Sequence, residues 1–223
     1  MHRLLLTALL AAISCTVPTR AEPGGAHAFE SEIAAYEAAD KTNPPPQGAI
    51  VFTGASGIRM WQTLAQDFSG LTVLNRGFGG SQLADSVYFA GRIVIPYHPK
   101  AVIIQAGGND INAGKSPEQV LADYQAWVVK VRAALPGVRL VYLGQGPSPL
   151  RWAQREKQQQ ANHLVREFIA KETNMAFVDI WAACLGPDGQ PRSELYIADQ
   201  LHPSAEQYQI RAKLIRPALE PSK

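Results

Sequence analysis

The chain has 223 residues, 46% of them hydrophobic, which suits one globular domain with a sizeable core. Its formal net charge is +2 and its basic residues form no cluster or stripe, so the sequence gives no support for nucleic-acid binding. It contains neither an HExxH motif nor a CxxC pair, so no dedicated metal site is visible.

The N-terminus has the pattern of a signal peptide. Its apolar stretch, residues 4–13, is too short to span a bilayer and long enough for a signal-peptide core. Small residues favour cleavage after Ala21, whereas residues 12–15 resemble a bacterial lipobox ending in Cys15. We predict a signal peptide over residues 1–21 and an exported protein, periplasmic or secreted. The alternative is a lipoprotein anchored through Cys15, the one membrane contact that the sequence suggests.

The remaining chain alternates helix and strand patterns. An Ala- and Glu-rich helix over residues 30–40 and a Pro-rich linker form an N-terminal segment, 22–47, before a domain over 48–223. Apolar runs predict five strands, at residues 49–53, 71–74, 101–106, 138–143 and 175–178. Near-continuous apolar strands separated by helices indicate a parallel sheet covered on both faces. The predicted fold class is α/β, a three-layer α/β/α sandwich of about five parallel strands.

The clearest helix lies between the third and fourth strands. Ser116 is its expected N-cap, Pro117 its first residue, and Gln119 completes a capping box. Apolar residues recur at helical spacing from Val120 to Val131, and a Pro-Gly pair ends the helix.

Two further helices are expected nearer the C-terminus. One covers residues 152–172, and the other follows Ser204, where Gln207 would complete a second capping box. In the first of these helices, four apolar residues are expected to face the core: Leu164, Val165, Phe168 and Ile169.

Four short motifs follow or close apolar runs, at residues 54–56, 75–80, 107–110 and 199–202. Loops at the carboxyl ends of parallel strands gather at one edge of the sheet, where ligands bind. Together the motifs supply a hydroxyl, backbone N–H donors, a side-chain amide, and a carboxylate three residues from an imidazole. These are the groups that acyl transfer by a serine nucleophile requires.

Ser56, directly after the first strand, is the candidate nucleophile; the alternative is an N-cap for a helix beginning near Ile58. The Gly-x-Ser-x-Gly pattern of α/β-hydrolases is absent because Ile58 occupies its last position. Asp199 and His202 are close enough for the carboxylate to orient the imidazole as general base. The alternative is an unrelated surface Asp and a His before a helix cap.

The candidate oxyanion hole consists of the backbone N–H groups of Ser56 and Gly80 and the side-chain amide of Asn109. Gly80 and Asn109 are also common turn residues, so each alone is open to a structural interpretation. Asp110 is interpreted as structural, and Cys184, in an apolar stretch, as a buried small residue.

With these motifs in this order, the chain resembles the SGNH (GDSL-type) hydrolase superfamily over roughly residues 48–216. The resemblance implies a flavodoxin-like sandwich, no cofactor, and hydrolysis of esters or other acyl compounds. It also implies roles for Ser56 as nucleophile, Gly80 and Asn109 as oxyanion donors, and Asp199 and His202 as triad partners. Ala55, where many members carry Asp, and Gln200, where Gly is common, depart from the family pattern.

Four residues flanking the motifs are further candidates for substrate binding: Arg59, Arg76, Phe78 and Arg151. We predict an exported serine esterase that cleaves small acyl esters through an acyl-enzyme, with the ester as its small-molecule partner. The alternatives are a lysophospholipase or lipase-like enzyme on the same fold, or a carbohydrate- or lipid-binding module without turnover.

Overall fold

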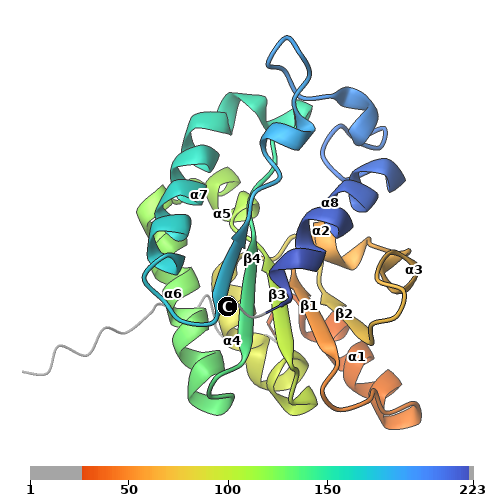
Figure 1. The fold of residues 1–223 in the computed structure, drawn as a ribbon. Coiled ribbons are helices and arrows are strands. Elements are labelled where there is room, and N and C mark those ends of the chain that lie inside the picture. Colours follow the sequence, from red (N-terminus) through yellow and green to blue (C-terminus); the bar gives the residue numbers. More distant parts are fainter. Residues whose placement is uncertain (1–26, 221–223) are drawn as a thin grey trace, which may run out of the picture.

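The computed structural model describes residues 27–220, which form one parallel sheet between two layers of helices (Figure 1). The strand order is β2-β1-β3-β4-β5, the flavodoxin-like order. The strands are β1 (Ile50–Gly54), β2 (Val73–Gly77), β3 (Ala101–Gln105), β4 (Arg139–Leu143) and β5 (Met175–Val178). The predicted α/β/α fold class is confirmed.

Successive residues of each central strand enter opposite cores, because side chains alternate between the faces of a sheet. In β3, Val102 and Ile104 pack in one core, whereas Ala101 and Ile103 pack in the other. Both faces are covered by helices, so every residue of β1, β3 and β4 is buried. This explains why the sequences of these strands are continuous runs of apolar residues.

Four helices cover one face of the sheet, and three cover the other (Figure 1). The first layer contains α1 (Glu30–Thr42), α4 (Leu83–Ile93), α6 (Pro117–Ala134) and α7 (Arg155–Ile169). The second contains α2 (Ser56–Arg59), α3 (Leu64–Asp67) and α8 (Ala205–Ala218). The short α5 (Gly108–Asn112) follows β3 directly. Short 3-10 segments occur at η1 (Ile95–Tyr97), η2 (Pro149–Gln154), η3 (Ala182–Cys184) and η4 (Ser193–Leu195).

Two predicted elements differ from the structure, and one helix was not predicted. Strand β2 begins two residues later than the apolar run and continues through polar Asn75 and Arg76, which pair with β1 at the edge of the sheet. The helix expected over 152–172 is a 3-10 segment with non-helical backbone at Arg151, followed by the shorter α7. Helix α4 was not predicted, because its capping residue is Gln82, an uncommon N-cap.

The two predicted capping boxes had different outcomes. Ser116 and Gln119 form both hydrogen bonds of the first box, as predicted. At α8, Ser204 caps the backbone N–H of Gln207, but the second bond of the box is absent. The Gln207 side chain instead bonds the Leu195 carbonyl and Arg211, so the prediction of a second box was wrong.

No helix among residues 27–220 is both long and apolar enough to cross a membrane. The predicted signal peptide and the lipobox with Cys15 lie outside the described residues. Cys184 is buried, as predicted, and its burial raises the pKa of its thiol.

Candidate active site

Ser56 and Asn109 follow adjacent strands at the point where the strand order reverses. Ser56 is the first residue of α2, just after β1, and Asn109 lies in α5, just after β3. In open α/β sheets this reversal leaves a crevice at the carboxyl edge. Gly54 permits the close approach of the two strands: its φ is +115°, and a Cβ there would lie 2.1 Å from the backbone oxygen of Gln105.

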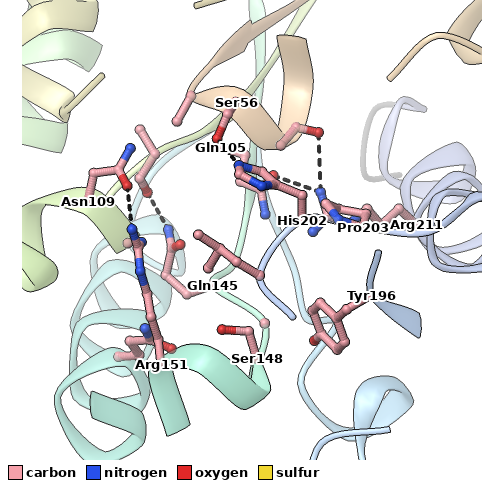
Figure 2. Close-up of a pocket in the computed structure, with 17 residues that line it drawn as sticks. Ser56, Gln105, Asn109, Gln145, Ser148, Arg151, Tyr196, His202, Pro203 and Arg211 are labelled. Atoms are coloured by element: carbon pink, nitrogen blue, oxygen red, sulfur yellow. Dashed lines mark hydrogen bonds between the residues drawn. The ribbon is translucent and has the colours of Figure 1, made fainter. Parts of the chain in front are cut away.

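Ser56, His202 and Asp199 form a continuous hydrogen-bonded chain. Ser56 Oγ lies 2.8 Å from His202 Nε2, across 146 residues of sequence. Figure 2 marks this hydrogen bond. On the other side of the ring, His202 Nδ1 lies 2.5 Å from Asp199 Oδ2. Asp199 Oδ1 also accepts the backbone N–H groups of Leu201 and His202, at 2.9 Å each. The loop backbone therefore fixes the orientation of the carboxylate that bonds the imidazole.

The environment of Asp199 favours its ionised form. Partial burial opposes ionisation, but hydrogen bonds from the His202 ring and from two backbone N–H groups outweigh it and lower the pKa of Asp199 to about 2. The carboxylate is thus charged at neutral pH, as it must be to stabilise an imidazolium.

Three N–H donors near Ser56 are free to bind an oxyanion. Among residues 27–220, the backbone N–H groups of Ser56 and Gly80 have no hydrogen-bond partner. Asn109 Nδ2 donates one hydrogen to the Ser81 carbonyl at 2.9 Å, which leaves its second hydrogen available. Arg151 Nη2 donates to Asn109 Oδ1 at 3.0 Å, so the amide nitrogen and oxygen have distinct partners (Figure 2).

Helix α1 holds the glycine loop that carries Gly80. Tyr36 donates its hydroxyl to the Gly77 carbonyl at 2.5 Å, and Glu32 accepts the Gly79 N–H at 3.3 Å. The loop also packs against the nucleophile turn, because a Cβ at Gly77 would lie 2.3 Å from the backbone nitrogen of Arg59.

A small polar cavity opens beside Ser56 (Figure 2). Its volume is about 90 Å³. Its principal polar side chains are Ser56, Asn109, Gln145, Arg151, His202 and Arg211. No Asp or Glu of the described chain lines it.

Of the four candidate substrate-binding residues, only Arg151 lines this cavity. Arg76 is buried and bonds Asp40, the Tyr97 hydroxyl and the Asn75 carbonyl, so its prediction as a substrate-binding residue was wrong. Phe78 was also predicted wrongly, because it is 0% exposed and packs between aromatic rings of the core.

Arg59 is half exposed and pairs with Glu32 at 3.4 Å beside the glycine loop, outside the cavity. Asp110 is fully buried and accepts hydrogen bonds from Leu83 N–H and Lys115, which agrees with its structural interpretation.

The sequence reasoning missed several polar residues of the cavity, including Gln105, Gln145 and Arg211. Two signals were present. Gln105 ends an otherwise apolar strand, and Arg211 interrupts the apolar stripe of α8 formed by Tyr208, Ala212 and Ile215. A polar residue in a core-facing position indicates either a buried network or a site.

No group of three or more His, Cys, Asp or Glu side chains within residues 27–220 is arranged to hold a metal ion.

Comparisons with known proteins find a relative of similar sequence. Platelet-activating factor acetylhydrolase IB subunit alpha1 from Homo sapiens is 32% identical over 163 residues, 68% of this chain and 66% of that protein. The chain thus spans slightly less than two thirds of the length of this relative.

Two solved structures share the fold. A Streptococcus pneumonia protein named for platelet activating factor superposes with a TM-score of 0.76 at 21% identity, covering 86% of this chain and 92% of the other. An acetylxylan esterase from Geobacillus stearothermophilus, solved as a catalytic serine-to-alanine mutant, gives 0.62 at 18% identity, covering 79% and 96%.

The model of the GDSL-like lipase/acylhydrolase family matches residues 15–210, which include all four motifs. This agrees with the SGNH (GDSL-type) resemblance of the sequence and implies hydrolysis of ester bonds. The chain belongs to the GDSL-like lipase/acylhydrolase family.

Proposed function

We propose that this protein is an exported serine esterase that hydrolyses short-chain acyl esters through an acyl-enzyme. The observation that carries the proposal is the hydrogen-bonded chain from Ser56 through His202 to Asp199, beside three free N–H donors. A nucleophile, a base held by a carboxylate, and oxyanion donors are the complete set for acyl transfer.

In the first half of the reaction, Ser56 Oγ attacks the ester carbonyl while His202 Nε2 takes the hydroxyl proton. The carbonyl oxygen becomes an oxyanion that accepts hydrogen bonds from Ser56 N–H, Gly80 N–H and Asn109 Nδ2. Asp199 stabilises the imidazolium that forms. The intermediate collapses, His202 gives the proton to the departing alkoxide, and the acyl group remains on Ser56.

In the second half, a water molecule takes the place of the alcohol. His202 accepts a proton from this water as its oxygen attacks the acyl carbon, and the same N–H donors bind the second oxyanion. Collapse breaks the bond to Ser56 Oγ, which recovers its proton from the imidazolium. The products are one carboxylic acid and one alcohol.

Two observations support a short acyl group. The cavity volume of about 90 Å³ is smaller than the roughly 150 Å³ of an apolar cavity that holds benzene. The names of the human relative and of the Geobacillus structure both refer to acetyl esters. Export rests on the signal-peptide pattern of residues 1–21 alone.

A fluorophosphonate probe tests the nucleophile. It is expected to label the wild-type protein covalently and to leave Ser56→Ala unlabelled, because phosphonylation requires the activated serine hydroxyl. Ser148→Ala is the matched control, since Ser148 lines the same cavity but has no imidazole partner among the described residues; this variant should keep the label. Undiminished labelling of Ser56→Ala would contradict the proposed nucleophile.

A further inference from the structure

Arg211 is a buried cation without a counter-ion in the described structure. The residue is 5% exposed and lies on α8, against the nucleophile turn. No carboxylate among residues 27–220 comes within ion-pairing distance of it. Charged side chains are almost never buried unless they are paired, because removing a charge from water is costly. Arg211 therefore requires an explanation.

Neutral groups accept some of the hydrogen bonds that its guanidinium can donate. Arg211 Nε donates to Gln207 Oε1 at 3.0 Å. Its Nη1 donates to Gln105 Oε1 at 2.8 Å and approaches the Gly57 carbonyl at 3.5 Å. Its Nη2 has no hydrogen-bond partner within the described chain. Figure 2 shows the guanidinium turned toward Gln105 and His202 at the centre of the pocket.

The titratable neighbours of Arg211 do not supply a negative charge. Burial raises the pKa of Tyr208 to about 12 and also raises those of Tyr196 and Cys184, so all three are neutral near pH 7. Burial lowers the pKa of Arg211 from its ordinary value, as expected for a cation without an anionic partner. Arginine nevertheless keeps its charge in proteins.

The cavity as a whole has the character of an anion site. Arg211 and Arg151 both line it, and neither forms an ion pair among the described residues. In Figure 2 the two guanidinium groups approach the pocket from different sides, with His202 and Gln145 between them. Gly57, whose carbonyl faces Arg211, directly follows Ser56, so an anion beside Arg211 would lie close to the reacting hydroxyl.

We propose that the enzyme prefers esters that carry a carboxylate near the scissile bond, and that Arg211 binds this carboxylate. Guanidinium groups bind carboxylates through short, charge-assisted hydrogen bonds, and the free Nη2 supplies unused donors. The inference rests on the proposed esterase function and adds the charge of the substrate. The carboxylate belongs to the acyl group or to the alcohol, and the test separates the two.

Two matched pairs of esters measure the preference. Ethyl hydrogen succinate and ethyl butyrate share a four-carbon acyl chain and a leaving group, but only the first carries an acyl carboxylate. Para-acetoxybenzoate and para-acetoxybenzamide share an acetyl group, but only the first carries a carboxylate on the leaving group. The kcat/KM of the charged member is expected to exceed that of its neutral partner about tenfold or more in one pair, as for one charge-assisted hydrogen bond.

Substitutions of Arg211 assign the preference to this residue. Arg211→Met should reduce the charged-to-neutral ratio to about one, and Arg211→Lys should restore part of it. Arg216→Met is the matched control, because Arg216 lies on the same helix but bonds the Asp67 and Ser69 carbonyls. This control should leave the ratio unchanged.

A purely structural role for Arg211 predicts a different result, in which Arg211→Met lowers activity on both members of each pair equally. That outcome overturns the inference. A wild-type charged-to-neutral ratio of kcat/KM near one in both pairs overturns it as well. So does a preference for the charged ester that is lost in Arg151→Met but kept in Arg211→Met. If Arg211→Met does not fold, inhibition of ethyl butyrate hydrolysis tests the role of Arg211. Succinate should inhibit the wild-type enzyme about tenfold more strongly than succinamide. Arg211→Lys should change this ratio of inhibition.

These results are separable from failure of the proposed function. If Ser56→Ala keeps full activity, or if none of the four esters is hydrolysed, the esterase proposal fails and the inference fails with it. If Ser56 is required but neither pair shows a charge preference, the esterase proposal stands and only the role of Arg211 is overturned.

Discussion

The Asn109 side chain is held by hydrogen bonds at both ends of its amide. Its oxygen accepts from Arg151 Nη2 at 3.0 Å, and its nitrogen donates to the Ser81 carbonyl at 2.9 Å. Because both ends of the amide are engaged, the second N–H points in a fixed direction. A preoriented donor of this kind stabilises the transition state without reorganisation cost.

Asn109→Ala is therefore expected to lower kcat about 10²–10³-fold with little change in KM, since the oxyanion forms only after attack. Steady-state kinetics on a neutral short-chain ester measure both parameters. Asn112→Ala is the control, because Asn112 lies in the same short helix, α5, but outside the cavity. A loss confined to KM would make Asn109 a substrate-binding residue rather than an oxyanion donor.

Asp199 links the active-site loop to the acid stability of the protein. Its pKa is lowered to about 2 in the folded state, below its ordinary value of 3.8. A carboxyl group with a depressed pKa stabilises the fold above its ordinary pKa, and this contribution is lost as the pH falls toward the folded-state value. The stabilisation is thus fully present at neutral pH and disappears between about pH 4 and pH 2.

We expect the difference in unfolding free energy between wild type and Asp199→Asn to shrink as the pH falls from about 4 to about 2. Urea denaturation at several pH values measures this difference. A difference that does not depend on pH would show that the folded state does not favour the charged carboxylate.

Helix α1 is bound to the edge of the sheet by polar contacts as well as by its apolar face. Ile33 is in the core, and Asp40 bonds Arg76 of β2 as well as the Tyr97 hydroxyl. Tyr36 bonds the Gly77 carbonyl at the start of the loop that carries Gly80. The N-terminal helix therefore contributes to the position of a proposed oxyanion donor.

Arg76→Met is expected to lower the free energy of unfolding by about 1–3 kcal/mol, because it removes the charged partner of the partly buried Asp40 carboxylate, which keeps its hydrogen bond from the Tyr97 hydroxyl. KM should not change, since Arg76 does not contact the cavity. Urea denaturation measures the change in stability, and steady-state ester kinetics measure KM.

Arg59→Met is the comparison, because it removes an exposed ion pair and should cost at most about 1 kcal/mol. If Arg76→Met left the stability unchanged and raised KM, Arg76 would be a substrate-binding residue after all.

The whole molecule places a small, polar pocket at the carboxyl edge of its sheet. Within residues 27–220, no long apolar helix lies over the opening of the pocket, and the longest connection around it, from β5 to α8, contains loops and two 3-10 turns. A long acyl chain gains about 0.8 kcal/mol per methylene only where apolar walls enclose it. Most residues that line the cavity here have polar side chains or are glycines.

We expect kcat/KM to be highest for acetyl to butyryl esters and to fall with longer acyl chains. A series of neutral para-nitrophenyl esters of increasing acyl length measures this, with Ser56→Ala as the blank for spontaneous hydrolysis. A maximum at about ten carbons or more would require an apolar acyl site and would favour a lipase-like or lysophospholipase function.

The sequence by itself determined the parallel α/β architecture and the positions of the reactive groups. Continuous apolar runs between helical patterns are local signals, and they placed all five strands to within a few residues. The spacing of Asp199 and His202 is also local, because the loop itself brings carboxylate and ring together. Ser56 could be singled out because it follows a strand directly, at the edge where such loops gather.

Only the tertiary structure decided which side chains enter the cavity. Arg76 and Phe78 flank the same glycine loop, yet Arg76 enters a partly buried ion pair and Phe78 the aromatic core. Conversely, Arg211 meets Gln105 across 106 residues of sequence, a contact that no local pattern specifies. The direction of a side chain depends on how helices from distant parts of the chain pack on the sheet, and this packing is fixed by the whole core at once.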